Sequence, residues 1–243
     1  MTVIAIGSVH GSPGVTSLVV DLARVAAARE AGRALIVEAD PDGGRLAARL
    51  DLAVRPGLTE LAGAARVGIA ADDLWRYAQL HDDIAVVVAH PASEQVHAAL
   101  RAAASHIGEA LCRLGATVVI DVGRLRPGSP ALALAALADH TVIVSDNDVE
   151  AIVSLTHRTK LLQGIGRSLV VLADAKPYAA ADVERAAGIA VWGTVPRASN
   201  HKRARARHYT LESLLLALDV RPEEPAVATR HEWAAPVDEM VTA

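Results

Sequence analysis

The stretch TVIAIGSVHGSPGVTS, residues 2–17, decides the fold of this chain. Its apolar beginning, 2–7, predicts a strand, and the alanine- and valine-rich stretch 15–31 has the spacing of a helix. The loop between them contains Gly11 and Gly14, which permit the unusual backbone angles of a tight loop. A strand, a glycine-containing loop and a helix in this order predict a place where backbone N–H groups and a helix N-terminus hold an anion.

The loop residues alone support two interpretations. In the first, the loop cradles a phosphate and Thr16 places its hydroxyl where it would meet Mg²⁺. In the second, the loop is an ordinary strand-to-helix turn whose Ser and Thr side chains cap the helix. Both interpretations stay open at this point.

Short apolar runs alternate with longer helical stretches along the rest of the chain. A long helix is predicted at 93–114, and further strands are predicted at 34–38, 84–89, 117–121, 140–145, 168–173 and 189–194. These strands are apolar throughout, as expected when helices cover both faces of a sheet. The alternation predicts an α/β fold with a doubly wound, mostly parallel sheet flanked by helices. In such folds ligands bind at the carboxyl ends of the strands.

Composition limits the remaining possibilities. The chain has 243 residues, of which 52% are hydrophobic, and this suits one domain, predicted to span 1–220. Residues 221–243 hold three prolines and five acids and are predicted to form a flexible acidic tail. A net charge of −4 excludes a protein that is basic overall. Without a positively charged leader or an apolar run of roughly 20 residues, we expect a cytoplasmic protein with no direct membrane insertion.

Four later segments follow the loop in a fixed order. They are VEADPDGG (37–44), PGLTEL (56–61), VVIDVG (118–123) and GTVPR (193–197). Together with the loop, this series resembles the MinD/ParA family of deviant Walker P-loop ATPases over roughly residues 2–218. It is most similar to the CpaE/TadZ-like branch, in which PGL-x-E-L follows the acidic second strand. The resemblance implies ATP and Mg²⁺ as ligands, and a face-to-face homodimer across the nucleotide pockets.

The family loop reads Lys-Gly-Gly-x-Gly-Lys-Thr-Thr. The resemblance assigns nucleotide binding to the matching positions His10, Gly11, Ser12, Gly14, Val15, Thr16 and Ser17, and to Pro196 of the last segment. Both family lysines are absent, since His10 and Val15 stand in their places and no lysine occurs before Lys160. Cations placed on a transferring phosphoryl group contribute about 10³–10⁵ in rate. The sequence therefore predicts little or no ATP turnover, with ATP or ADP and Mg²⁺ bound weakly or not at all.

The acidic positions match the family better. The resemblance places Asp40 and Asp121, together with Thr16, near the metal, and gives Glu38 the position of the acid that orients the attacking water. Because Glu is one methylene longer than the family Asp, Glu38 fits that catalytic role less well. The other interpretation of each carboxylate is a cap on a neighbouring helix. An Asn reads adenine in many family members, and Asp174 occupies the corresponding stretch, where it can accept but not donate hydrogen bonds.

Three functional hypotheses follow. The first is a non-catalytic or very weakly catalytic placement or regulatory subunit, partnered in a pilus, secretion or division machinery or in chromosome positioning. The second is a slow Mg²⁺-dependent ATPase that uses a substitute arginine, with Arg24, Arg45 and Arg124 near the relevant loops in sequence. The third is a partition-type protein that binds DNA without sequence preference through phosphates. Its basic patch would comprise Lys202, Arg203, Arg205 and Arg207, which also suits an acidic protein partner or is simply a solvated helix start.

Overall fold

The computed structural model describes residues 2–11, 13–29, 34–197 and 201–219, without the side chains of 201–203 and 219. The strands are β1 Val3–Ser8, β2 Ala34–Glu38, β3 Gln79–His81, β4 Ile84–Val87, β5 Thr117–Arg124, β6 His140–Ser145, β7 Ser168–Leu172 and β8 Val191–Thr194. The α-helices are α1 Val15–Arg29, α2 Leu46–Arg49, α3 Leu58–Ala65, α4 Ser93–Leu111, α5 Leu132–Leu137, α6 Val149–Gly164, α7 Ala180–Ala187 and α8 His201–Asp219. A 3₁₀ helix, η1, spans Ala71–Tyr77.

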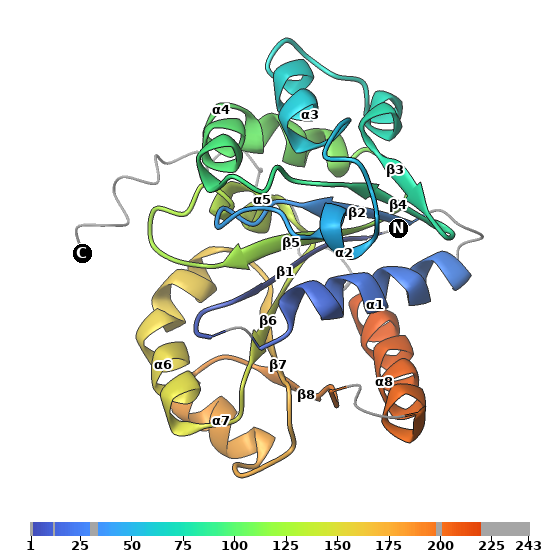
Figure 1. Ribbon diagram of the computed structural model, residues 1–243. Helices are drawn as coiled ribbons and strands as arrows, with labels where there is room; N and C mark the ends of the chain where they lie inside the picture. Colours follow the sequence, from blue (N-terminus) through green and yellow to red (C-terminus); the bar gives the residue numbers. More distant parts are fainter. Residues whose placement is uncertain (1, 12, 30–33, 198–200, 220–243) are drawn as a thin grey trace, which may run out of the picture.

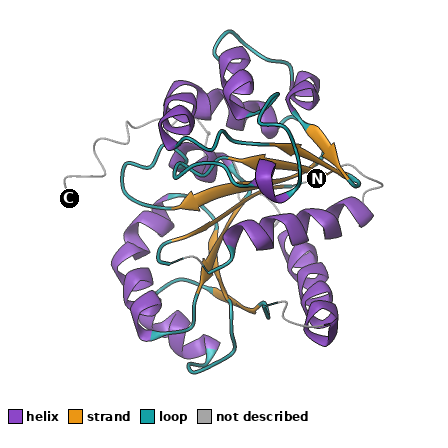
Figure 2. Cartoon of the chain, viewed as in Figure 1, coloured by secondary structure: helices purple, strands orange, loops and turns teal. Residues whose placement is uncertain are grey.

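The strands form one sheet in the order β3-β4-β2-β5-β1-β6-β7-β8. Every neighbouring pair is parallel except β3 and β4, which are antiparallel. Helices cover both faces of this sheet (Figures 1 and 2). The predicted α/β class with a doubly wound, mostly parallel sheet is therefore confirmed.

Alternating side chains on the central strand supply both cores. Val3 and Ala5 of β1 pack into the cluster that includes α3, α4, α5, α6 and α7, whereas Ile4 and Ile6 pack into the cluster that includes α1 and α8. Successive residues of a strand point to opposite faces, so a continuous apolar run is needed when both faces are covered. This explains why β1 and its neighbours lack the polar alternation of a half-exposed strand.

Seven of the eight strands lie where the sequence predicts them, with ends that differ by a few residues. Strand β5 continues to Arg124, three residues beyond the predicted 117–121, and β8 begins at Val191 rather than 189. The edge strand β3 was not predicted, because QLH (79–81) is too short and too polar to stand out. No helix of the described residues is long and apolar enough to cross a bilayer.

The sheet order places a natural ligand site beside β1. Strand β1 lies between β5 and β6; the chain continues from β1 past β5 to β2 on one side, and from β5 past β1 to β6 on the other. Such a reversal of direction is where α/β proteins bind ligands. Gly7 allows the end of β1 to lie against β5, since a Cβ at this position would lie 2.9 Å from the carbonyl oxygen of Gly123. The β1–α1 loop, the end of β2 and the end of β5 thus meet at one edge of the sheet.

Candidate functional site

A cavity of about 250 Å³ opens at this edge, beside the carboxyl ends of β1, β2 and β5. It is bounded by the β1–α1 loop, the start of α1, the β2–α2 connection, α2 itself and the end of β5. The residues that line it are Ser8, Gly11, Gly14, Val15, Thr16, Ser17, Asp40, Asp42, Arg45, Arg49, Asp121, Gly123 and Arg124. The structure therefore brings together the glycine loop and the acidic strand ends, which the sequence analysis linked only through a resemblance.

Asp121 and Thr16 form the floor of the cavity. The Thr16 hydroxyl donates a hydrogen bond of 2.7 Å to Oδ2 of Asp121, and the Gly123 N–H donates one of 3.0 Å to Oδ1. Only 1% of Asp121 is exposed, and this burial raises the pKa of its carboxyl group to about 7. The charges of Asp40 and Glu38 raise this pKa further, while the two hydrogen bonds oppose the shift.

Asp40 lies against β5 in a place that only glycine leaves open. Gly123 has a φ of +60°, and a Cβ built on it would lie 2.1 Å from Oδ1 of Asp40. The Asp42 N–H donates a hydrogen bond of 2.9 Å to the same oxygen. Burial raises the pKa of the Asp40 carboxyl group, and the charge of Asp42 adds to the effect. Asp40 thus lines the same cavity as Asp121.

Glu38 has a different position from the two aspartates. Its Oε1 accepts hydrogen bonds from the Arg45 and Leu46 N–H groups at 2.6 and 2.9 Å, and its Oε2 accepts one from the Ala89 N–H at 2.8 Å. Burial raises the pKa of this carboxyl group, although the three backbone donors oppose the shift. Glu38 does not line the cavity. Its contacts correspond to the capping interpretation, because they join the start of α2 to the segment after β4.

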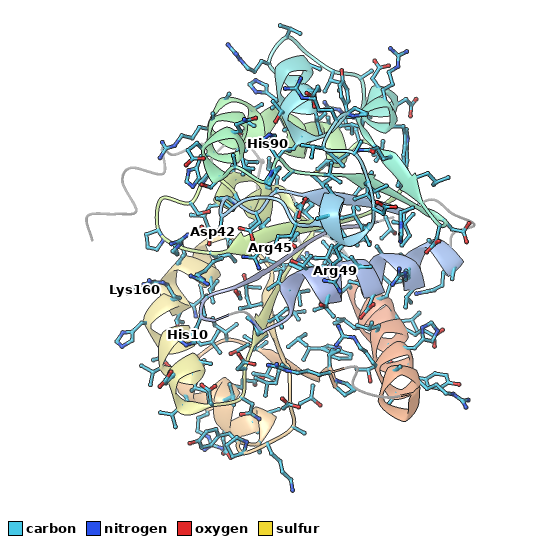
Figure 3. All side chains as sticks on the ribbon, viewed as in Figure 1. His10, Asp42, Arg45, Arg49, His90 and Lys160 are labelled. Atoms are coloured by element: carbon cyan, nitrogen blue, oxygen red, sulfur yellow. The ribbon has the colours of Figure 1, made fainter. Side chains whose placement is uncertain are left out.

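Three arginines line the cavity. Arg45 is the residue directly before α2, and Arg49 is the last residue of that helix. Arg49 donates a hydrogen bond of 3.1 Å from Nη2 to the Ser17 hydroxyl, and Arg124 donates one of 3.1 Å from Nη2 to the Gly11 carbonyl oxygen. Arg45 is the third (Figure 3). Arg49 was missed by the sequence analysis, although its i, i+4 spacing from Arg45 could have indicated that both lie on one side of α2.

Arg24, the remaining arginine considered as a lysine substitute, lies elsewhere. Its guanidinium nitrogens are 3.9 Å from Oδ1 of Asp21 and 3.8 Å from Oδ2 of Asp82, and it does not line the cavity. Of the three candidate substitute arginines, only Arg45 and Arg124 therefore line the cavity. Arg24 lies nine residues after the start of α1, where it reaches Asp82 in the turn between β3 and β4.

The oxygen atoms of Thr16 and Asp121 are of the kind that hold Mg²⁺ together with phosphate in proteins. Among the described residues no group of three or more His, Cys, Asp or Glu side chains could hold a metal ion by itself. Mg²⁺, however, is commonly bound by one or two carboxylates together with substrate phosphates and water. The Thr16 hydroxyl and the Asp121 carboxylate, 2.7 Å apart, are oxygen donors of that kind.

Some of the other predicted nucleotide-binding residues line the cavity and others do not. Gly11, Gly14, Val15 and Ser17 line the cavity, and Ser12 lies outside the described residues. His10 does not line it; its Nε2 is 3.9 Å from Oε2 of Glu150, at the start of α6.

Pro196 and Asp174 also lie outside the cavity lining. The Pro196 carbonyl oxygen accepts a hydrogen bond of 3.0 Å from Nη1 of Arg207. Arg197 forms an ion pair with Asp146 after β6, and its Nε lies 3.6 Å from Oδ2 of Asp174 after β7. The polar groups of Arg197, Asp146, Asp174 and Pro196, which follow β6, β7 and β8, therefore already have partners within the protein.

The basic segment at the start of α8 is smaller than expected. The Arg207 side chain is only 10% exposed, and its Nε lies 2.7 Å from Oδ2 of Asp21 on α1. The expectation that Arg207 contributes to an exposed basic patch is wrong, because its guanidinium joins α8 to α1 and to Pro196. Arg205 is exposed, whereas the side chains of Lys202 and Arg203 lie outside the described part of the chain.

Comparison with known proteins places the fold in a defined class. No family model and no curated protein matches this chain. Among solved structures, a ParA family ATPase from Chlorobium tepidum TLS matches with a TM-score of 0.69 and 14% identity, covering 89% of this chain and 91% of that one. The cell division ATPase MinD from Pyrococcus furiosus matches with a TM-score of 0.67 and 15% identity, covering 89% and 99%.

A third match extends this class beyond cell division. Cobyrinic acid a,c-diamide synthase from Mycobacterium smegmatis, solved with an ATP analog and magnesium, has a TM-score of 0.63 and 19% identity, covering 88% of this chain and 94% of that one. At these identities the matches define the fold alone. The chain has the fold of the MinD/ParA P-loop NTPases.

Proposed function

We propose that this chain is a MinD/ParA-type P-loop protein with a weakened ATP site, related to the CpaE/TadZ-like branch. It acts as a non-catalytic or very weakly catalytic placement or regulatory subunit. The observation that carries this proposal is the hydrogen bond between Thr16 and Asp121 at the floor of a cavity whose described lining residues include no lysine. The hydroxyl and carboxylate of a phosphate and Mg²⁺ site are retained, whereas the ammonium groups that drive cleavage are missing.

The residues have distinct roles in this proposal. Backbone N–H groups of the β1–α1 loop and of the start of α1 hold the phosphates, because a helix N-terminus favours an anion. Thr16, Asp121 and Asp40 hold Mg²⁺, which when bound neutralises phosphate charge. Val15 contributes a hydrocarbon side chain where the family has a lysine. Glu38 orients α2 and not the attacking water, since its oxygens are bound to three N–H groups.

The biological setting is proposed from the resemblance and the fold together. A complex of MinC and MinD from Aquifex aeolicus shares the fold, with a TM-score of 0.64 and 14% identity. We propose that this chain forms a homodimer in the cytoplasm and works with a protein partner in pilus, secretion or division machinery. The domain is proposed to span 1–220, with 221–243 as an acidic tail that lies outside the described residues.

A slow ATPase is the second candidate, and one observation favours it. Arg45, Arg49 and Arg124 line the cavity, so a guanidinium could stand near a transferring phosphoryl group. DNA binding gains no such support, since the burial of Arg207 removes one of the four proposed cations. The two remaining candidates differ in turnover and not in binding.

Calorimetric titration of the full chain with ATP and ADP, with and without Mg²⁺, tests the proposal. We expect binding of both nucleotides that Mg²⁺ strengthens. Thr16→Ala should weaken Mg²⁺-nucleotide binding roughly tenfold, because one oxygen ligand is lost. Thr156→Ala is the matched control, since that threonine is exposed on α6 and donates only to backbone carbonyls. Absence of binding by either nucleotide would refute the proposed function.

A further inference from the structure

We infer that the cavity recognises the phosphate chain of its ligand through Arg49 and Arg124 and does not read the base. The ligand class is a triphosphate, whether carried by any nucleoside or free as inorganic tripolyphosphate. This inference rests on the proposed function and names the chemistry that the same site selects.

The first support is the origin of the positive charge. Arg49 extends from α2 to the Ser17 hydroxyl, in the first turn of α1, and Arg124 extends from β5 to the Gly11 carbonyl in the loop. The two guanidinium groups thus contact the beginning and the end of the segment that would hold phosphate. Arginine binds phosphate oxygens in a bidentate manner through a planar fork of donors. A pair of such groups replaces a lysine that neither the loop nor the first 159 residues provide.

Two carboxylates of the lining differ in the charges they face: Asp42 is paired from outside the cavity, whereas Asp40 interacts with the charges of Arg45 and Arg124. Asp42 forms an ion pair with Arg126, 2.6 Å from Nη2, so its charge is already matched from outside the cavity. Asp40 and Asp121 both lie beside Gly123, which leaves space for the Asp40 carboxylate and donates its N–H to Asp121, and they mark the Mg²⁺ side. In this arrangement Arg49 and Arg124 would bind the phosphate oxygens, and Asp40 and Asp121 would bind the metal.

The second support is the extent of the cavity. Its described lining residues come from 8–17, 40–49 and 121–124, and no described residue after β6, β7 or β8 is among them. Its volume of about 250 Å³ lies below the roughly 300–1,000 Å³ that is usual for small-molecule pockets. The space suits a phosphate chain and its metal, with the nucleoside left outside.

The third support is the state of the polar groups where a base would be read. Arg197 binds the carboxylates of Asp146 and Asp174, and the Pro196 carbonyl is taken by Arg207. A base could recruit these groups only by displacing contacts that already exist. Discrimination among bases needs unmatched donors and acceptors at fixed positions, and these residues do not offer them.

The test compares four probes on the full chain by calorimetry: ATP, GTP, CTP and inorganic tripolyphosphate, each with Mg²⁺. We expect the four dissociation constants to agree within about threefold. Arg49→Gln and Arg124→Gln should each weaken all four by roughly tenfold or more, because a charge-assisted hydrogen bond is lost. Arg49→Lys should recover part of the affinity. Arg101→Gln, on an exposed position of α4, is the matched control and should leave binding unchanged.

The outcomes separate this inference from the proposed function. ATP binding more than tenfold tighter than GTP and tripolyphosphate would overturn the inference and leave a nucleotide-binding protein in place. Wild-type affinity in both glutamine variants, with unchanged unfolding temperatures, would overturn the role of the arginines. Failure of all four probes to bind wild-type protein would overturn the inference and the proposed function together.

Discussion

The buried carboxyl group of Asp121 makes the stability of the unliganded protein depend on pH. Its pKa is raised to about 7 in the folded chain by burial, from an ordinary value of 3.8. A folded-state pKa above the unfolded one means that the folded state binds more protons between these two values. This contribution to stability is fully present below about pH 4 and is lost as pH rises through 7.

The size of the effect follows from the shift. Integrating over pH, Asp121 alone lowers the free energy of unfolding by about 3 kcal/mol between pH 5 and pH 8. Glu38 and Asp40, whose pKa values are also raised by burial, change stability in the same direction. Asp121→Asn removes the ionising group and keeps an oxygen that can accept from Thr16. The variant should therefore lose less stability over this range than the wild-type chain.

Urea unfolding in EDTA at pH 5, 6, 7 and 8 measures this difference. Wild-type protein should lose the Asp121 contribution mostly between pH 5 and pH 7, with a smaller further loss up to pH 8, and Asp121→Asn should show a total decrease smaller by about 3 kcal/mol. Asp139→Asn is the control, because that aspartate lies at the opposite end of the sheet, before β6, and is exposed. Equal slopes for wild type and Asp121→Asn would refute the assignment of a proton to this buried group.

Three further substitutions test the frame of the site. Gly123→Ala should lower the free energy of unfolding by about 2–3 kcal/mol, because the added Cβ would displace Asp40 and the φ of residue 123 is positive. An unchanged melting temperature would contradict this. Glu38→Gln should lower the free energy of unfolding by about 1–3 kcal/mol and weaken phosphate binding, since one acceptor oxygen cannot serve three N–H groups. Unchanged stability in urea unfolding and unchanged affinity in calorimetry would argue against the positioning role. Arg207→Ala should lower the free energy of unfolding by about 1–2 kcal/mol, because Asp21 loses its ion-pair partner at 2.7 Å. Chemical denaturation that shows no loss of stability would contradict a stabilising link between α8 and α1.

The fold could be predicted because the signals that specify it are local. Continuous apolar runs separated by helical stretches require a sheet covered on both faces, and seven strands lie where those runs occur. Parallel strands bring their carboxyl ends to one edge of the sheet, so residues at the ends of β2 and β5 are expected to lie close together. Asp40 and Asp121 line the same cavity for this reason, although 81 positions separate them in the chain.

Side-chain partners could not be predicted in the same way. The resemblance gives Glu38 the position of a water-orienting acid, yet its oxygens accept from N–H groups at the start of α2 and from that of Ala89, a residue 51 positions away. Arg207 looked like one cation of a basic run, but α8 turns it onto Asp21, 186 positions earlier. Arg49 was missed because α2 is only four residues long and follows a connection rich in glycine. Each of these outcomes depends on packing between elements and not on local pattern.

Phosphate release from Mg²⁺-ATP by the purified full chain tests the central claim most directly. The claim is that the site retains its hydroxyl and carboxylates, binds phosphate, and lacks the two family lysines that accelerate cleavage, whose positions His10 and Val15 occupy. We expect saturable binding with turnover at or below about 10⁻³ s⁻¹, the order of a P-loop NTPase that lacks its arginine finger. Turnover near 1 s⁻¹ that Asp121→Ala abolishes and Arg101→Gln leaves intact would contradict the claim.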